Sequence, residues 1–479
     1  MQDEELYECS RRVSRRELLA LAAAAAPAVA TGRRLAWPAV ARSASPPIVK
    51  PLPPEWFVRL GTNAEMRWEA MRDQGYEVPN ERFFVRNHSA TPSIDPATWR
   101  LRGFGSGLRG RPGLDAAVEF SLDDPLALPA RRTTAFIECA GNGRSFFASH
   151  QGTPAAGSAW RLAAIGVARW KGVPLAELLE RAGVRHGAVD VMPQGLDAPV
   201  VSDGVDHGHV RRPLPVGKAL DDVLLAYEMN GEQLPRDHGF PVRLVVPGWI
   251  GIASVKWVGQ IEVSETPVFS PCNTKWYRFT SPSYPPDSPP LAEQPVKSAF
   301  ELPWNARLVA GRRQRLHGRS WSGRGRIRSV EVSTDGGASW RRARLHGPLR
   351  ADAWTRWELP WTPPERGGNE PLARATDATG LRQPATVPFN DAGLPVLGGR
   401  AAPGGGRVIK CGDSDDRAAQ RPRRRLDQRR HRRPRRAPAR ARGDGRGRPA
   451  GAQRRWQGRQ PGRRGGPRGR VGVARRRGR

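Results

Sequence analysis

The C-terminal end of the chain has a composition that cannot form a hydrophobic core, which confines folding to the sequence before it. From Ala401 to Arg479 there are 28 Lys or Arg against five Asp or Glu, so about +23 of the net charge of +33 lies in this segment. Arg, Gly, Pro and Ala dominate it without a hydrophobic period, and such segments remain disordered. We therefore predict a disordered basic tail over residues 394–479.

Three interpretations of this tail are open. An Arg/Gly-rich arm could bind nucleic acid, but such arms normally interleave aromatic residues, and Trp456 is the one aromatic residue in the segment. The tail could instead be solvated and have no partner. We favour a third interpretation, a translated wrong reading frame of a GC-rich gene, since the folded pattern before it stops short of a last strand. Functional nucleic-acid binding by the tail is therefore not expected.

The N-terminus, residues 1–30, has the order of features expected of an export signal. The segment Ser14–Leu19 resembles a twin-arginine motif, an apolar run over Leu18–Ala26 follows, and Ala28–Ala30 offers a small-x-small cleavage site. An Ala-rich amphipathic helix is the alternative. The run is too short to span a bilayer, and no other stretch is long and apolar enough. We expect export of the folded protein to the periplasm or another extracytoplasmic space, with residues 31–54 as an extended lead-in.

Residues 55–290 show a mixture of short strands and a few helices, which predicts an α+β domain. The clearest helix is expected over Val173–Val184, with Pro174 in its first turn and Gly183 at its C-terminal end. Strands are expected over the following segments: Phe83–His88, Thr133–Ile137, Val189–Met192, Val242–Pro247, Ser254–Val258 and Gln260–Val263.

Residues 291–393 change to regularly spaced short strands separated by Gly, Pro and Asp turns. The expected strands are Arg307–Val309, Gln314–Leu316, Ile327–Val332, Trp340–Ala343, Trp354–Leu359 and Leu372–Ala375. This spacing is typical of a small immunoglobulin-like β-sandwich. The sequence thus predicts a mixed α/β domain followed by a sandwich.

Cys139 stands at the end of the apolar run Thr133–Ile137 and is followed at once by Gly141 and Gly143. Glycines allow a tight turn and a close backbone approach to a ligand. Arg144 is a nearby cation that favours the thiolate. These residues suit a metal ligand or a reactive nucleophile, and a buried structural cysteine is the alternative. With Cys272 as the other cysteine of the folded part, no disulfide framework is implied.

The run Phe136–Arg144 resembles the molybdenum site of the sulfite oxidase family. Further segments resemble the family in order along the chain: Phe84–His88, Trp160–Leu175, Gly195–Asp197, Leu224–Gly231, His238–Arg243, Ser254–Trp257 and the turn Val332–Gly337. The resemblance covers about residues 55–393. It implies a molybdopterin-binding domain, a β-sandwich that forms a homodimer, and a bound molybdenum cofactor.

By this resemblance Cys139 is the single protein ligand of molybdenum, a role that a soft thiolate suits. Asp197 would accept hydrogen bonds from pterin N–H groups, while Arg243 and Lys256 suit the phosphate. The cofactor-binding residues implied in this way are Phe84, Val85, Arg86, Asn87, His88, Asp197, His238, Arg243, Ser254, Val255 and Lys256.

The family implies a small sulfur oxyanion as substrate, with sulfite oxidised to sulfate by oxygen-atom transfer. Guanidinium groups bind oxyanions through paired hydrogen bonds, and Arg86 and Arg144 are the matching positions. Trp160 would form a wall of the substrate pocket, and Tyr277 would hydrogen-bond the substrate. No haem-attachment motif is present, so a separate electron acceptor such as a c-type cytochrome is implied.

The sequence also departs from the family pattern. Gly143 stands where some members have a second arginine, and Ser254 stands where the animal enzymes have histidine. These departures leave other substrates open, and a sulfane-sulfur dehydrogenase or a sulfoxide reductase with the same cofactor are alternatives. The sandwich argues against the related sulfoxide reductases, which lack it. A non-enzymatic nucleic-acid-binding protein is the remaining alternative.

Overall fold

The computed structural model of the 479-residue chain describes residues 47–71, 74–302, 306–364, 367–369, 371–385, 387–394 and 409–412. The expected export signal, most of the lead-in, and the tail apart from Leu394 and residues 409–412 lie outside this part. Within it, every helix is too short or too polar to cross a membrane.

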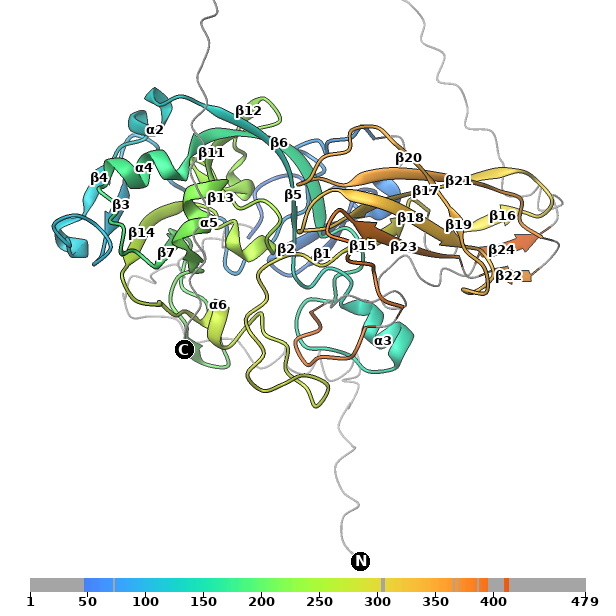
Figure 1. Ribbon diagram of the computed structural model, residues 1–479. Helices are drawn as coiled ribbons and strands as arrows, with labels where there is room; N and C mark the ends of the chain where they lie inside the picture. The colour runs from blue at the N-terminus through green and yellow to red at the C-terminus, as the bar shows by residue number, and fades with distance from the viewer. Residues whose placement is uncertain are drawn as a thin grey trace, which may run out of the picture. The chain divides into compact units, whose positions relative to one another are not determined.

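One sheet carries the cysteine motif at the end of a long strand. Its order is β12-β11-β6-β5, with β13 also paired to β11. β5 and β6 run antiparallel along the whole of β5, from Arg131 paired with Gly172 to Glu138 paired with Ile165 (Figure 1). The strands are β5 (Arg131–Glu138), β6 (Ile165–Pro174), β11 (Leu224–Met229), β12 (Glu232–Gln233) and β13 (Arg243–Val245).

A second sheet has the order β10-β7-β14-β3-β4 and combines antiparallel pairs with the parallel pair β14 and β3. Helix α4 (Leu175–Arg181) packs Leu175, Leu178 and Leu179 into the core beneath it. The predicted helix is confirmed over this range, and Gly183 beyond its end has a φ of +80°, which glycine adopts without strain. The strands are β3 (Leu101–Phe104), β4 (Val118–Phe120), β7 (Asp190–Gly195), β10 (Leu214–Pro215) and β14 (Val258–Ser264).

Short elements connect these sheets. The paired strands among them are β1 (Phe57–Leu60), β2 (Asn63–Met66), β8 (Val201–Ser202) and β9 (Val205–Asp206). The α-helices are α2 (Asp123–Ala127), α3 (Ser145–Gln151), α5 (Val216–Asp221) and α6 (Pro271–Thr274). The 3-10 helices are η1 (Trp68–Met71), η2 (Leu114–Ala116), η3 (Arg236–His238) and η4 (Gly251–Ala253).

The region after residue 290 forms two antiparallel sheets around a core of its own. One sheet has the order β15-β17-β21-β20 and the other β19-β18-β23 (Figure 1). Trp357 and Leu359 of β21 and Val330 of β18 are buried in this shared core, so alternate residues of each strand face inward. The strands are β15 (Lys297–Phe300), β17 (Gln314–Trp321), β18 (Ile327–Ser333), β19 (Arg341–Arg342), β20 (Arg344–His346), β21 (Thr355–Trp361) and β23 (Leu372–Asp377). The predicted α+β fold class is confirmed.

A small third sheet in this region includes residues of the predicted tail. β24 (Ile409–Gly412) pairs in parallel with β16 (Arg307–Val309) and antiparallel with β22 (Gly367–Asn369). The sequence analysis assigned all of residues 394–479 to a disordered tail, whereas the structure places these four residues in a strand. Their backbone pairing does not depend on a hydrophobic period, which explains why the pattern gave no signal.

The segment Phe83–His88, predicted as a strand, forms an isolated bridge instead. Val85 exchanges backbone hydrogen bonds with Ala64, at 2.9 Å in each direction. Phe83, Phe84 and Val85 are buried like strand residues, but the backbone then turns and presents the following polar side chains to a cavity. The strand predicted over Phe83–His88 is therefore wrong, apart from the bridge at Val85.

Candidate active site

A cavity that is open to solvent lies next to the end of β5, with about 700 Å³ of empty space including its mouth, and most of the predicted site residues line it. The predicted residues on its wall are Phe84, Arg86, Asn87, His88, Cys139, Asp197, His238, Arg243, Ser254, Val255, Lys256 and Tyr277. They come from segments far apart in the sequence. The fold thus gathers them around a single space, while the role of each remains a prediction.

Cys139 follows β5 directly and lies on the wall of this cavity. Its backbone N–H donates to the Ala164 carbonyl at 2.9 Å, and its own carbonyl accepts from the Asn142 N–H at 2.9 Å, which closes a turn. A Cβ on Gly141 would lie 2.8 Å from the Arg144 guanidinium carbon, so a larger residue there would displace the end of this arginine side chain. The turn fixes the position of Cys139, a residue that is 8% exposed.

Glu138, the residue before the cysteine, is fully buried and is held mainly by residues from beyond position 290. Its Oε1 accepts from Lys297 Nζ at 2.7 Å and from Asn142 Nδ2 at 2.9 Å, and its Oε2 accepts from Trp321 Nε1 at 2.8 Å. Its backbone carbonyl accepts from Gln294 Nε2 at 2.7 Å. Contacts from the sandwich region and the segment before it therefore fix the position of the cysteine-bearing turn.

The buried Arg243 and the half-buried Lys256 line the cavity without a carboxylate partner among the described residues. Arg243 donates to the backbone carbonyls of His238 and Ser254, each at 2.9 Å, and Lys256 Nζ donates to the Asp237 carbonyl at 2.8 Å. Burial lowers the pKa of Arg243 to about 9 and that of Lys256 well below its usual range. A bound anion would favour both charged forms, so this wall suits a phosphate.

Asp197 is an acceptor that lacks a partner on the same cavity. Its side-chain Oδ1 is buried and has no hydrogen-bond partner in the described part of the chain. Burial raises the pKa of this carboxyl to about 6, against the smaller opposing effect of Lys256. A buried polar atom without a partner is unfavourable, so a ligand that donates hydrogen bonds would complete this site.

Arg86, His88 and Tyr277 form a chain of side chains on the cavity wall. Arg86 Nη2 lies 2.9 Å from His88 Nε2, and the Tyr277 hydroxyl lies 3.5 Å from the same nitrogen. Burial lowers the pKa of His88 well below its usual range and raises the pKa of Tyr277 above its usual range. At neutral pH the imidazole is therefore uncharged and the phenol retains its proton.

Arg144, Trp160 and Val85 are predicted site residues that lie outside the cavity lining. Arg144 Nε donates to the Ala392 carbonyl and its Nη1 to the Ser158 carbonyl, each at 3.0 Å. Burial lowers the pKa of Arg144, and the charge of Cys139 in its thiolate form would oppose this effect. Trp160 is fully buried and packs edge-on against Phe84, which does line the cavity. Val85 is buried beneath the wall.

The cavity wall also contains residues that were not singled out as site residues: Phe83, Ile137, Ala140, Val210, Asp237, Gly251, Ile252 and Trp257. Asp237 accepts from the backbone N–H groups of Val49 and Lys50 and thereby fixes the lead-in segment next to the cavity. Asp237 directly precedes the motif that begins at His238, and this position in the sequence could have indicated that it lies at the site. The contact between Lys297 and Glu138 had no signal in the sequence, since its partners lie 159 positions apart.

Two family models match this chain. The oxidoreductase molybdopterin-binding domain matches residues 88–272, and the Mo-co oxidoreductase dimerisation domain matches residues 289–396. The first contains the cysteine turn and most of the cavity wall, and the second contains the two sandwich sheets.

Individual proteins match across both regions. The chain is 38% identical over 342 residues to mitochondrial sulfite oxidase of Mus musculus, covering 68% of this chain and 60% of that protein. It is 39% identical over 353 residues to sulfite oxidase of Gallus gallus, covering 68% of this chain and 72% of that protein. This chain therefore spans about 60% of the length of the mouse relative.

Among solved structures, the sulfane dehydrogenase SoxCD from Paracoccus pantotrophus matches with a TM-score of 0.62 and 29% sequence identity. The match covers 76% of this chain and 91% of that chain. The similarity in structure thus extends over the cavity region and the sandwich together.

Proposed function

Because this chain belongs to the sulfite oxidase family of molybdopterin-dependent oxidoreductases, we propose that it oxidises a small sulfur oxyanion, with sulfite oxidation to sulfate as the reaction. The observation that carries the proposal is the position of Cys139 on a cavity that also presents Arg86, Arg243 and Lys256. Overall, sulfite gains one oxygen atom from water and gives up two electrons, with release of two protons. A soft sulfur ligand beside cations that have no carboxylate partner in the described part of the chain suits an anionic cofactor and an anionic substrate.

The residues on the cavity wall fit a molybdenum–pterin group. Cys139 offers the soft sulfur donor, and Arg243 and Lys256 are cations without a carboxylate partner among the described residues. Asp197 Oδ1, which lacks a partner there, matches the N–H groups on the edge of a pterin ring. The cavity wall therefore offers a ligand for the metal, cations for the phosphate and a hydrogen-bond acceptor for the pterin ring.

The molybdenum cofactor, when bound, supplies oxygen-atom transfer and accepts two electrons. Cys139 would hold it through its thiolate, while Arg243 and Lys256 neutralise the phosphate. The Arg86 guanidinium would bind oxygen atoms of the substrate and orient it. Tyr277, whose hydroxyl keeps its proton because burial raises its pKa, would donate a hydrogen bond to the same substrate.

A sulfane-sulfur dehydrogenase is the second candidate. It is favoured by the match to the solved sulfane dehydrogenase, which covers 91% of that chain. The two candidates share the cofactor and differ in the substrate, which is a sulfane sulfur in one and sulfite in the other.

Three further features belong to the proposal. We propose a homodimer formed through the sandwich region, supported by the match to the dimerisation domain over residues 289–396. We propose transfer of electrons to a separate carrier. We also propose export by the twin-arginine route, supported by Arg15 and Arg16 and the apolar run after them.

The test uses protein produced in a host that makes the molybdenum cofactor. Metal analysis should find about one molybdenum per chain, because the thiolate site binds one metal. Sulfite should then reduce an artificial one-electron acceptor, and Cys139→Ser should lose this activity while its circular dichroism spectrum stays unchanged. Cys272→Ser is the matched control, since Cys272 is a buried cysteine that does not line the cavity.

Protein that contains no molybdenum or pterin after such expression would overturn the proposal. Wild-type sulfite oxidation by Cys139→Ser would overturn the assignment of the metal ligand. Molybdenum-loaded protein that oxidises a sulfane sulfur and leaves sulfite unchanged would favour the second candidate.

A further inference from the structure

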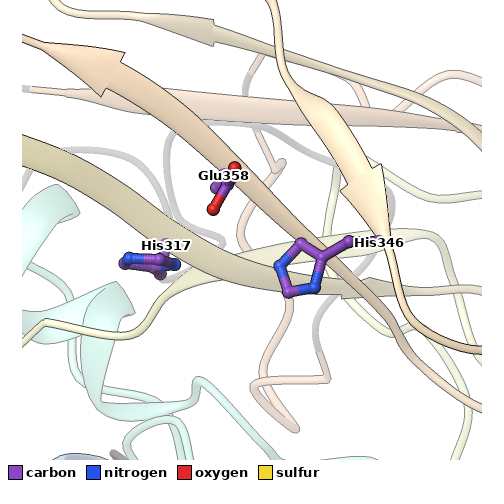
Figure 2. Close-up of side chains that lie close together, drawn as sticks. All are labelled: His317, His346 and Glu358. Atoms are coloured by element: carbon purple, nitrogen blue, oxygen red, sulfur yellow. The ribbon is translucent and has the colours of Figure 1, made fainter.

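Two histidines and a glutamate gather on one face of the β15-β17-β21-β20 sheet, outside the cavity described above. Figure 2 shows His317, Glu358 and His346 side by side on neighbouring strands. The possible ligand atoms of the three side chains all lie within 4.8 Å of one another. Each residue comes from a different strand, so the sheet itself sets their spacing.

The register of the sheet explains this proximity. His317 of β17 pairs directly with Glu358 of β21, and His346 of β20 pairs with Arg356, two positions from Glu358 along the same strand. Residues two apart in a strand point to the same face. The three side chains therefore share one face because of backbone pairing, and they do not depend on a flexible loop for their positions.

The exposure of these residues allows an ion to reach them. Glu358 is 7% exposed, and both histidines are half-buried. A buried carboxylate between two accessible imidazoles gives a site that is open to solvent and anchored at its base. Zinc is commonly bound by two histidines and one carboxylate, with a further position left for water.

Two arginines contact the same carboxylate, and each would affect a bound cation in two opposing ways. Arg344 donates through Nε and Nη2 to Glu358 Oε1, while Arg315 Nη1 lies 3.3 Å from Oε2. These cations oppose a metal by charge, but their contacts also fix the orientation of the carboxylate, as outer partners of metal ligands do. Their side chains are 69% and 63% exposed, so water screens their charge.

We propose that His317, His346 and Glu358 form a binding site for a divalent transition-metal ion of the zinc class. Imidazole nitrogens favour zinc and its neighbours over magnesium and calcium, which prefer oxygen ligands. Ligand atoms around zinc lie roughly 3.4 Å apart at bond lengths of about 2.1 Å. Half-buried imidazoles can close from separations of up to 4.8 Å by changing rotamer. The bound ion would tie β17, β20 and β21 together, independently of the molybdenum chemistry.

The test is a titration of the molybdenum-loaded full chain, freed of other metals by a chelator and carrying no polyhistidine tag. Zn²⁺ is added in competition with a chromophoric chelator, and Co²⁺ is added separately as a spectroscopic probe. We expect one high-affinity Zn²⁺ site per chain. We also expect a Co²⁺ spectrum of nitrogen and oxygen ligands without a thiolate charge-transfer band, which excludes binding at any of the cysteines.

His317→Ala and His346→Ala should each weaken Zn²⁺ binding by roughly tenfold or more, since each removes one of three ligands. Glu358→Gln should do the same. His186→Ala is the matched control, because His186 is an exposed histidine far from this sheet in sequence. The affinity of this variant for Zn²⁺ should equal that of the wild type. Zn²⁺ should raise the melting temperature of the wild type and of the control, and not that of the two histidine variants.

Wild-type protein that binds Zn²⁺ more weakly than about 100 μM would overturn the proposal. Equal affinity in the wild type and both histidine variants would also overturn it, as would a thiolate band in the Co²⁺ spectrum. Molybdenum content and sulfite turnover are measured on the same samples and should be the same in all these proteins. A failure of the proposed function would change these two values, whereas a failure of the zinc proposal would change only Zn²⁺ binding.

Discussion

Lys297 and Glu138 form a buried ion pair, with Lys297 Nζ 2.7 Å from Glu138 Oε1 and with side chains that are 4% and 0% exposed. Glu138 directly precedes the cysteine that lines the cavity, whereas Lys297 begins the first strand of the sandwich. A buried charge destabilises the folded state strongly when its oppositely charged partner is removed. The pair therefore links the stability of the sandwich region to the position of the proposed metal ligand.

Lys297→Ala should destabilise the protein strongly, since it leaves the Glu138 carboxylate buried without its cation. Removing one partner of a buried ion pair costs about 3–5 kcal/mol, and we expect a loss of this size in the free energy of unfolding measured with urea. Arg324→Ala is the control. Arg324 pairs with Glu293, but both side chains are about half exposed, so its loss should cost less than about 1 kcal/mol. Equal effects of the two substitutions would contradict the prediction.

In the cofactor-free protein, Asp197 should contribute stability that is lost as pH rises between about 4 and 6, against the opposite contribution of His88 and His238, whose pKa burial lowers. Burial raises the pKa of Asp197 to about 6 in the folded state, whereas an unfolded aspartate titrates near 4. The unfolded state therefore loses its proton first, and the folded state loses stability until its own carboxyl ionises. Glu65, whose pKa burial also raises to about 6, acts in the same direction.

Asp197→Asn should flatten part of this pH dependence and leave the share due to Glu65. Melting temperatures of wild type and variant, measured from pH 4 to pH 7, test this expectation. The two curves should converge at the acid end, where the wild-type carboxyl is protonated in both states. A variant whose melting temperature follows the wild type at a constant offset would show that Asp197 does not titrate in this range.

Arg86 and Arg144 should differ in their effect on turnover. Arg86 lines the cavity, whereas both Arg144 contacts named above are to backbone carbonyls. Arg86→Gln should raise KM for sulfite by roughly tenfold or more through loss of a charge-assisted hydrogen bond. Arg144→Gln should mainly lower the melting temperature, because it leaves the Ala392 and Ser158 carbonyls without their donor. A larger increase in KM for Arg144→Gln would assign substrate binding to Arg144.

Two truncations should separate β24 from the rest of the tail. Deletion from residue 413 onward leaves the pairing of β24 with β16 and β22 in place, while deletion from Ala401 onward removes it. We expect the longer deletion to lower the melting temperature more than the shorter one. Sulfite turnover per molybdenum should stay at the wild-type value in both, since the described cavity residues all precede position 278. Loss of turnover in either truncation would show that the tail contributes to catalysis.

The sequence allowed the cofactor wall to be predicted because its residues are carried by short local motifs. Cys139 with its glycines, and the segments beginning at His238 and Ser254, kept their order and reached one cavity. What the motifs lacked was contact information. Arg144 lies within the cysteine motif, yet its guanidinium donates to the Ala392 carbonyl, 248 positions away.

The supporting contacts could not be predicted because they join residues remote in sequence with no shared pattern. Lys297 and Trp321 lie outside the strands predicted from the sequence, and no local pattern pairs them with Glu138. Lys50 was assigned to an extended lead-in, but its Nζ donates to the Phe83 carbonyl, and burial lowers its pKa to about 7. The contacts of such side chains are set by tertiary packing, and hydrophobic periodicity contains no information about them.

The hydrogen bonds from Gln294, Lys297 and Trp321 to Glu138 mean that the sandwich is more than a surface for pairing subunits. It cannot be exchanged for that of a relative as an independent module unless those three donors are carried along. In a chimeric protein without these donors, the buried Glu138 carboxylate would lack hydrogen-bond partners. The expected result is poor cofactor binding at Cys139, although the exchange changes no residue of the cofactor site.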